Sequence, residues 1–256
     1  MKETINTVQS VDRTIKIIEV LSSHRDGLGL TELSQIIGLH KSTVHRLLLT
    51  LICHGYVSQN PQNQHYHMTI KMYELGSRVI DSMDLSKVSR PYLKALRDVT
   101  NEVVHLVIPD GTDIVYIDKM ESNNSIRMHS RIGARSPLYS TSAGKAMLAY
   151  LPESRIKEIW DASDIVQRTP NTVVKYDHLL MVLEKVRENG YALDDEENEP
   201  GIRCIGAPIF NHKGDVIGAI SISGPTMRVT PEVVKTFRVH ILKYTRLISQ
   251  ELGYRL

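Results

Sequence analysis

The sequence predicts an α+β protein with an N-terminal winged helix-turn-helix, a linker helix and a C-terminal domain built on an antiparallel sheet. Three observations indicate this fold class. Residues 30–54 hold two short amphipathic segments on either side of a glycine turn. A hairpin pattern follows them directly. Beyond residue 100, strand and helix patterns occur without the regular βαβ alternation of parallel sheets.

The second segment of the helix-turn-helix pattern has an apolar and a polar face. Its apolar residues recur at i, i+3, i+4 and i+7 and form one stripe, which consists of Val44, Leu47, Leu48 and Leu51. The residues off this stripe are Lys41, Ser42, Thr43, His45, Arg46 and Thr50. No acidic residue occurs from 41 to 54, whereas an ordinary helical hairpin usually carries Glu and Lys pairs on its solvent face. The polar face is therefore predicted to read double-stranded DNA in the major groove.

The flanking segments complete the winged motif. A supporting helix is predicted from Val11 to Leu21, with Ser10 or Asp12 as its cap. After Gly55, strands at 56–58 and 65–69 around a turn at 60–63 form the wing. Leu49 points outward and has two open roles, contact with a thymine methyl or packing on the wing.

Composition and charge limit the classes of function. With 256 residues and 41% hydrophobic content, the chain suffices for a small domain at 1–70, a linker helix at 71–84 and a larger domain at 85–256. Residues 1–70 carry six Lys and Arg against five Asp and Glu, so this domain is nearly neutral. Six of the eleven histidines also lie in this domain, so we expect mild acid to make it more cationic and to strengthen phosphate binding. The alternative is that most of them are ordinary surface histidines.

Cofactor, metal and membrane signals are weak throughout the chain. The two cysteines, Cys53 and Cys204, provide neither a disulfide framework nor zinc spacing, and they fit a reducing compartment. His65 and His67 share a strand face, but no further ligand lies near them in the sequence. There is no apolar leader and no run of eighteen apolar residues. The expectation is a cytoplasmic protein without metal, cofactor or membrane contact.

The pattern after residue 70 indicates helices at 70–80 and 85–100, the second with Pro91 near its start. Such helices favour subunit pairing. The domain that follows is predicted to contain strands at 103–108, 113–120, 125–132, 203–210 and 216–223, and helices at 143–151, 175–189 and 230–252.

Three segments of this domain are candidates for one small-acid site. Small residues at Ser142 and Ala143 begin a helix, where free N–H groups favour a carboxylate. Ser221 and Ser223 lie two apart on a strand and so share a face. Asp194 opens the acidic run DDEENE, which offers acceptors to ligand hydroxyls. Each segment also has a purely structural interpretation. The small residues can serve helix packing, the serines can be solvated, and the acidic run can be a solvent-exposed loop.

An enzyme is the alternative class, with Cys204 as nucleophile or Asp194 as base in the same cleft. Against it, the chain has no GxSxG or CxxC signature and no nucleotide-binding loop. Cys204 also precedes the apolar Ile205, a setting more typical of a buried than of a reactive thiol.

Long motifs in the expected order resemble the IclR family of bacterial transcriptional regulators. The matching stretches are HKSTVHRLLLTLICHGYV, STSAGKAMLAYLP and GYALDDEENEPGIRCIGAPIFNHKGDVIGAISISGP. The resemblance extends from residue 8 to the C-terminus. It implies a C-terminal GAF-like effector domain and a homodimer or homotetramer that binds operator DNA and responds to a small carboxylate. With one reading motif per chain, a paired protein requires a palindromic operator.

The resemblance also implies which residues hold the effector. They are the backbone at Ser142 and Ala143, the side chains of Asp194, Cys204, Ser221 and Ser223, and an apolar wall of Met128 and Ile202. Ser136 and Ser142 replace the leucine and glycine of glyoxylate-type members, which makes the site more polar. The stretch IVYIDKMESNNSIRMHSRIGARSPLYST resembles the KdgR-type repressors of sugar-acid catabolism, whose effector is 2-keto-3-deoxygluconate. The more polar site is consistent with such a hydroxylated sugar acid.

Overall fold

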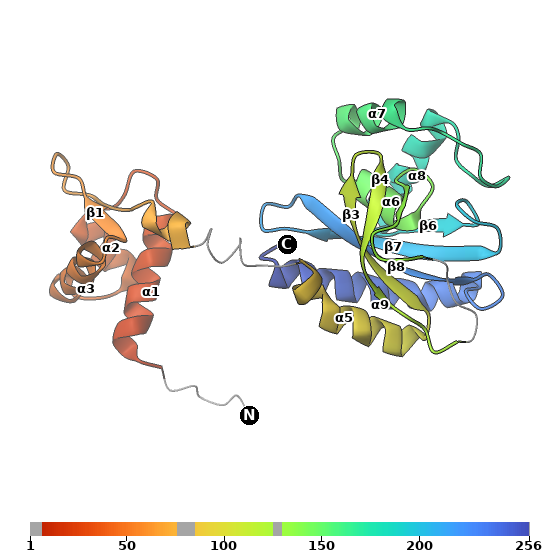
Figure 1. Ribbon diagram of the computed structural model, residues 1–256. Coiled ribbons are helices and arrows are strands. Elements are labelled where there is room, and N and C mark those ends of the chain that lie inside the picture. Colours follow the sequence, from red (N-terminus) through yellow and green to blue (C-terminus); the bar gives the residue numbers. More distant parts are fainter. Residues whose placement is uncertain (1–6, 76–84, 125–129, 256) are drawn as a thin grey trace. The chain divides into compact units, whose positions relative to one another are not determined.

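The computed structural model describes residues 7–75, 85–124 and 130–255. The chain divides into two compact units, Met1–Ser82 and Met83–Leu256, which we call the reader unit and the effector unit (Figure 1). Met128 and most of the predicted linker helix lie outside the described residues; residues 71–75 are helical.

The reader unit packs three helices and a hairpin around one small core. Its elements are α1 (Gln9–Ser22), α2 (Leu30–Ile37), α3 (Lys41–Cys53), β1 (Val57–Gln59) and β2 (Tyr66–Met68). Gly38 adopts a left-handed conformation with φ 74° and ends α2, which allows the sharp turn into α3. β1 and β2 pair antiparallel as the predicted wing.

The apolar stripe of α3 packs into this core as predicted. Val44, Leu48 and Leu51 are buried, Leu47 is half-buried, and Leu49 points outward with half of its surface exposed. The predicted cap of α1 was wrong. The helix begins at Gln9 behind Val8, because the N–H groups of Val11 and Asp12 already donate to the Val8 carbonyl. Asp12 lies within the first turn, where the positive end of the helix dipole stabilises its carboxylate.

The effector unit is a six-stranded antiparallel sheet between two helical layers. The strands follow the order β5-β4-β3-β8-β7-β6, and every neighbouring pair is antiparallel. Their bounds are β3 (Val103–Asp110), β4 (Asp113–Met120), β5 (Arg135–Pro137), β6 (Ala192–Asp195), β7 (Ile202–Phe210) and β8 (Val216–Pro225). The helices are α5 (Leu85–Thr100), α6 (Ser142–Leu148), α7 (Glu153–Ala162), α8 (Tyr176–Asn189) and α9 (Pro231–Glu251).

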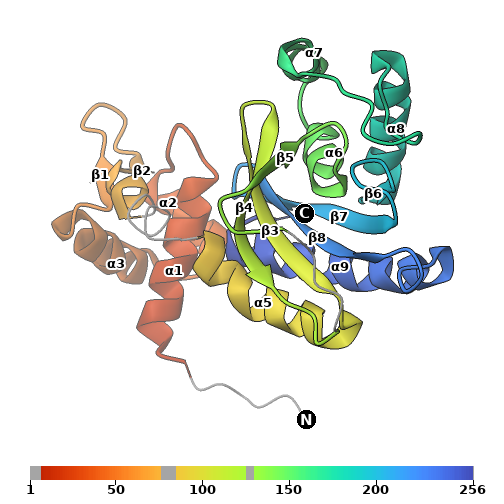
Figure 2. The ribbon, with the colours of Figure 1, turned by 45° about the vertical axis from the view of Figure 1, so that its right-hand side comes forward.

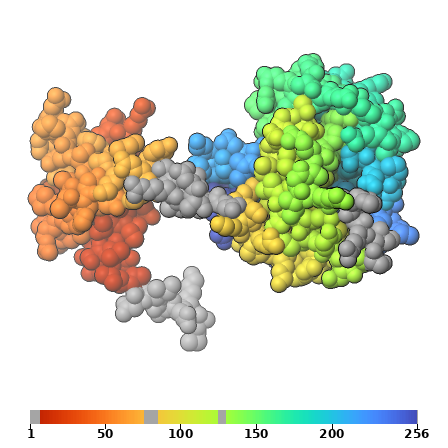
Figure 3. All heavy atoms as spheres, viewed as in Figure 1, coloured from red at the N-terminus to blue at the C-terminus, as the bar shows by residue number. Residues whose placement is uncertain are grey.

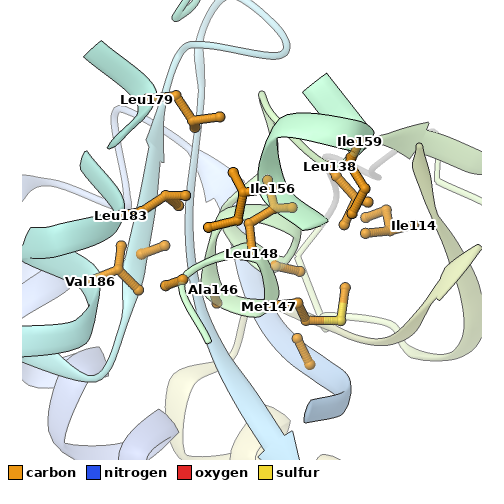
Figure 4. Packing of buried hydrophobic residues seen from close by; sticks show 14 of the residues in the cluster. Ile114, Leu138, Ala146, Met147, Leu148, Ile156, Ile159, Leu179, Leu183 and Val186 are labelled. Atoms are coloured by element: carbon orange, nitrogen blue, oxygen red, sulfur yellow. The ribbon is translucent and has the colours of Figure 1, made fainter. Parts of the chain in front are cut away.

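The two helical layers cover opposite faces of the sheet. Helices α5 and α9 lie side by side on one face (Figure 2), where they bury Ile205, Ile220 and Ile222 among other residues. Helices α6, α7 and α8 pack around a second core on the other face (Figure 4), built on residues such as Leu148 and Leu183. Since side chains alternate along a strand, Cys204, Ser221 and Ser223 face the α6 side.

Three elements differ from the sequence prediction. No strand occupies the described part of 125–132; β5 begins only at Arg135, because Gly133 (φ 83°) turns the chain before it pairs with β4. Helix α7, which buries Ile156 and Ile159, was not predicted. Strand β6 was also not predicted, and it places Asp194 inside the sheet rather than on a loop.

Candidate functional site

A polar cavity of about 220 Å³ lies on the α6 face of the effector unit's sheet. Its walls come from β3, β4, β7 and β8, from the start of α6, and from the segment around the end of β6. Most of the predicted effector residues line it, namely Ser142, Ala143, Asp194, Ile202, Cys204, Ser221 and Ser223, and Ser136 lines it as well. The structure therefore gathers residues that are far apart in the sequence into one site.

Two glycines bring the start of α6 to the wall of this cavity. A side chain at Gly206 of β7 would place its Cβ 2.6 Å from the Ala143 nitrogen, and one at Gly144 would lie 2.2 Å from the Leu138 carbonyl oxygen. Thr141 caps the helix by accepting a hydrogen bond from the Gly144 N–H at 3.1 Å. The Lys145 N–H donates to the Thr141 carbonyl. The N–H groups of Ser142 and Ala143 precede these bonds in the cavity-lining turn.

Asp194 is a buried carboxylate with only 3% of its surface exposed. Its Oδ1 accepts hydrogen bonds from the N–H groups of Glu197 at 2.8 Å and Asn198 at 3.2 Å. Burial raises the pKa of Asp194 to about 6, although the nearby Lys145 ammonium and the two backbone donors oppose this shift. Asp194 is therefore close to its titration midpoint under mildly acidic conditions.

A buried ion pair lies beneath the cavity wall. The Lys145 ammonium, which is completely buried, contacts the Glu197 carboxylate. Burial raises the pKa of Glu197, opposed by its attraction to Lys145. The pair connects α6 to the segment that follows β6, the same two parts of the chain that provide Ala143 and Asp194. Breaking such a pair leaves an uncompensated buried charge, typically at a cost of about 3–5 kcal/mol.

His105 on β3 forms a cluster with the serines of the cavity. Its Nδ1 lies 3.3 Å from the Ser221 hydroxyl and 3.5 Å from that of Ser223, and its Nε2 lies 2.7 Å from the Ser130 hydroxyl. Burial, with the Lys119 charge as a smaller contribution, lowers the pKa of His105 to about 3. The ring is neutral at physiological pH and can therefore both donate and accept a hydrogen bond.

Sequence reasoning missed His105 and Tyr116. The Tyr116 ring packs edge-on against His105 at 5.0 Å, and its hydroxyl lies 3.5 Å from the Ser136 hydroxyl. A usable signal existed for His105, because it is a single polar residue between Val104 and Leu106 in a strand predicted from its apolar residues. Tyr116 carried no such signal, because aromatic residues are common in strands.

Cys204 is a buried thiol without an activating partner among the described residues. Burial raises the pKa of this thiol, and the Asp194 carboxylate raises it further. A nucleophilic cysteine needs a neighbouring cation or base that lowers its pKa, which is the opposite of this environment. The geometry thus argues against the enzyme alternative.

In the reader unit, the predicted DNA-contacting residues do not all point the same way. Lys41, Ser42, His45, Arg46 and Thr50 are exposed, while Thr43 is half-buried. Thr43 and Thr50 line a hollow that also includes Ser10 and Arg13 of α1, and the Thr50 hydroxyl donates to the Arg46 carbonyl at 3.2 Å. Arg46 lines the same hollow.

The described ranges show neither a metal site nor a membrane-spanning helix. They contain no group of three or more His, Cys, Asp or Glu residues placed to hold a metal ion. No single helix in these ranges is both long and apolar enough to cross a membrane. Helices α2 and α3 reach the required length and apolar composition only together, and the pair is bent by 109°.

The chain combines a helix-turn-helix unit with a second unit that holds a polar cavity in an antiparallel sheet. This combination is typical of DNA-binding transcriptional regulators that also bind small effectors. The family comparisons agree with this class. Residues 10–61 match the IclR helix-turn-helix domain, and residues 77–250 match the C-terminal domain of the bacterial transcriptional regulator IclR. The chain belongs to the IclR family.

Its relatives are regulators along their whole length. The chain is 39% identical to the HTH-type transcriptional regulator KdgR of Escherichia coli K12, covering 97% of this chain and 94% of KdgR. It is 38% identical to the regulator XynR of the same organism, with 96% and 98% covered. The crystal structure of Thermotoga maritima IclR matches with a TM-score of 0.65 and 33% identity, covering 96% of this chain and 99% of that one. The families and relatives are transcriptional regulators, not enzymes.

The burial of Cys204 generates a prediction about thiol reactivity. In the native protein at pH 8, iodoacetamide should modify the exposed Cys53 and leave Cys204 largely unmodified, because only a thiolate that is accessible reacts. Mass spectrometry after timed labelling measures both sites, and unfolding in urea should make them react alike. Cys53→Ser should remove the fast reaction and Cys204→Ser should keep it. Fast modification of native Cys204 would reinstate the nucleophile hypothesis.

Proposed function

We propose that this protein is a cytoplasmic repressor of sugar-acid catabolism, released from its operator by a small keto acid such as 2-keto-3-deoxygluconate. The observation that carries the proposal is the polar cavity with Asp194, Ser221 and Ser223 in its walls. Similarity to KdgR supports it, but XynR is similar to the same degree, so identity alone does not separate effectors. The chemistry of the cavity has to do so.

The cavity offers matched partners to both ends of a hydroxylated keto acid. The N–H groups of Ser142 and Ala143 and the hydroxyls of Ser221 and Ser223 are donors for a carboxylate. Asp194 accepts hydrogen bonds from hydroxyls along the ligand chain. Ser136 and Tyr116 add polar groups on a further wall. A bare two- or three-carbon oxoacid would leave several of these buried groups without partners, which is costly.

Regulation then follows from the different affinity of the effector for two states of the protein. Binding in the effector unit lowers the population that is competent to bind DNA, provided that the effector prefers the other arrangement. By linkage, operator DNA weakens effector binding by the same factor. The reader unit provides the second site, through the exposed residues of α3.

The serine contact predicts a loss of effector affinity. Removing a hydrogen bond to a charged ligand group costs about 1.5–3 kcal/mol, so Ser221→Ala should weaken effector binding roughly ten- to a hundredfold. Calorimetry with 2-keto-3-deoxygluconate measures this change. Ser163→Ala, at the end of α7 and outside the cavity, serves as the control. Operator binding without effector should survive both changes.

The same titrations separate effector classes. Pyruvate and glyoxylate should bind more weakly than 2-keto-3-deoxygluconate, because they cannot reach the Asp194 carboxylate with hydroxyl donors. Clear binding of either short acid, together with no heat from the sugar acid, would refute the proposed effector and leave the family membership intact.

The exposed arginine of α3 predicts a role in DNA reading. If Arg46 reaches a guanine edge or a phosphate, Arg46→Ala should weaken operator binding by about 1–3 kcal/mol. Gel-shift titration at fixed salt measures the affinity, and circular dichroism checks folding. Arg25→Ala, at an exposed position before α2, is the matched control. Unchanged operator affinity for Arg46→Ala would place the reading surface elsewhere.

Assembly as a homodimer or homotetramer on a palindromic operator is supported by an apolar stripe on α1. Val11 and Ile15 are each about half exposed and share one helix face at i and i+4, and Val8 is exposed at the N-cap just before them. Ile70 and Tyr73 are exposed as well, at the start of the predicted pairing segment. Exposed apolar surface of this kind marks an interaction site.

Sedimentation should therefore show at least a dimer at micromolar concentration. Ile15→Glu should increase the monomer fraction, since a charge in an apolar interface loses solvation without gaining a partner. Glu19→Gln on the same helix provides a control that keeps the stripe intact. A monomeric protein that still binds operator tightly would contradict the assembly.

A further inference from the structure

The outer helical layer of the effector unit, formed by α5 and α9, is strongly basic. These two helices contain eight Lys and Arg residues against three Asp and Glu. The remainder of residues 83–256 has the opposite balance, with fifteen Lys and Arg against nineteen Asp and Glu. The unit is therefore almost neutral in total but electrically asymmetric.

Most of the positive charge in this layer is not neutralised by other described residues. Arg90 pairs with Asp118 at 3.0 Å and Arg97 with Asp98 at 2.8 Å. The other six have no ion pair within the described ranges, and all are exposed: Lys87, Lys94, Lys235, Arg238, Lys243 and Arg246. Arg238 lies over the Tyr191 ring and Lys243 over the Tyr244 ring, contacts that orient a cation without cancelling its charge.

The fold exposes these side chains along the two helices, with Arg238 beside Tyr191 and Arg246 beside a groove that includes Gly190. Phe237 and Ile241 of α9, and Leu93 and Leu96 of α5, are buried against the sheet, so the opposite faces of both helices point to solvent. The helices run side by side (Figures 1 and 2), and the yellow atoms of α5 reach the surface along the lower edge of the effector unit (Figure 3). With 21 residues, α9 extends for about 30 Å, close to one turn of duplex DNA.

We propose that this basic layer binds the phosphate backbone of duplex DNA outside the bases read by α3, without regard to sequence. The reader unit provides little of the charge that DNA binding uses, because its described residues carry six Lys and Arg against five Asp and Glu. The basic layer adds six further cations without an ion pair among the described residues, and phosphate contacts by Lys and Arg release counterions and add affinity. A two-fold pairing of this layer with itself would oppose identical positive surfaces, which disfavours a second copy as the partner.

The test compares two triple variants of the full chain. The first, Lys94→Gln with Lys235→Gln and Lys243→Gln, neutralises the basic layer. The second, Lys157→Gln with Lys175→Gln and Lys185→Gln, removes the same charge from exposed positions on and before α7 and α8. Operator affinity is measured from low to moderate salt on two duplexes, one trimmed to the operator and one with long flanks of arbitrary sequence.

On the flanked duplex, the slope of log affinity against log salt concentration should be smaller in magnitude by about two to three for the basic-layer variant than for the unaltered protein. Its affinity near 0.1 M salt should be about tenfold lower or more. On the trimmed duplex, the basic-layer variant should bind with the affinity of the unaltered protein. The control variant should bind with that affinity on both duplexes. Equal behaviour of the two variants on flanked DNA would overturn the proposal. So would equal losses on both duplexes, or a changed sedimentation coefficient, which would identify the layer as a subunit interface.

Discussion

The close approach of α6 to β7 at Gly206 determines where the effector unit can hold a ligand. Only a glycine lets the backbone of Ser142 and Ala143 lie directly against the strand, and any side chain there would push the helix away. The helix is short, capped by Thr141 and completely buried. Its first N–H groups therefore open into the space beside the sheet rather than into water. The cavity is what remains between this turn, the serines of β8 and Asp194.

One buried network connects several of the charges around that cavity. Lys145 is buried one turn further along α6 and pairs with Glu197, whose own N–H donates to Asp194. Asp194 thus shares one network with the ion pair, and the His105 cluster lies across the cavity from it as a neutral group. Fully partnered buried networks are rigid, and partly partnered ones are costly. One Glu197 oxygen has no partner among the described residues, so the network has capacity for a further donor.

Much of this architecture could be predicted from the sequence, and the exceptions have physical reasons. The α3 stripe follows helical periodicity, and the sheet strands β3, β4, β7 and β8 are long enough for their pattern to be recognised. Strand β6 could not be found in this way, because its acidic residues are compensated by groups that its own pattern does not show. Backbone donors and the Lys145 charge compensate Asp194, and Arg203 pairs with Asp195. The start of β5 depended on a turn at Gly133, whose effect on register appears only in three dimensions.

The candidate site was predicted partly by pattern and partly by family resemblance. Ser221 and Ser223 share a face by simple alternation. Asp194 and Cys204, in contrast, are opposite each other only because β6 pairs with β7, a register that the sequence does not display. His105 enters through the pairing of β3 with β8, which sets it opposite Ser221. Long-range strand pairing is thus the information that local patterns lack.

The internal pairing of Lys145 has a consequence for what the cavity rejects. No lysine or arginine lines the cavity in the described ranges, and the nearby Lys145 ammonium is already paired with Glu197. Phosphate and sulfate, which gain most from a free cation, would meet two acidic side chains, Asp194 and Glu199, without compensation. A metabolite that brings hydroxyl donors as well as a carboxylate meets partners for both. The lining therefore favours a hydroxylated organic acid over inorganic anions such as phosphate and sulfate.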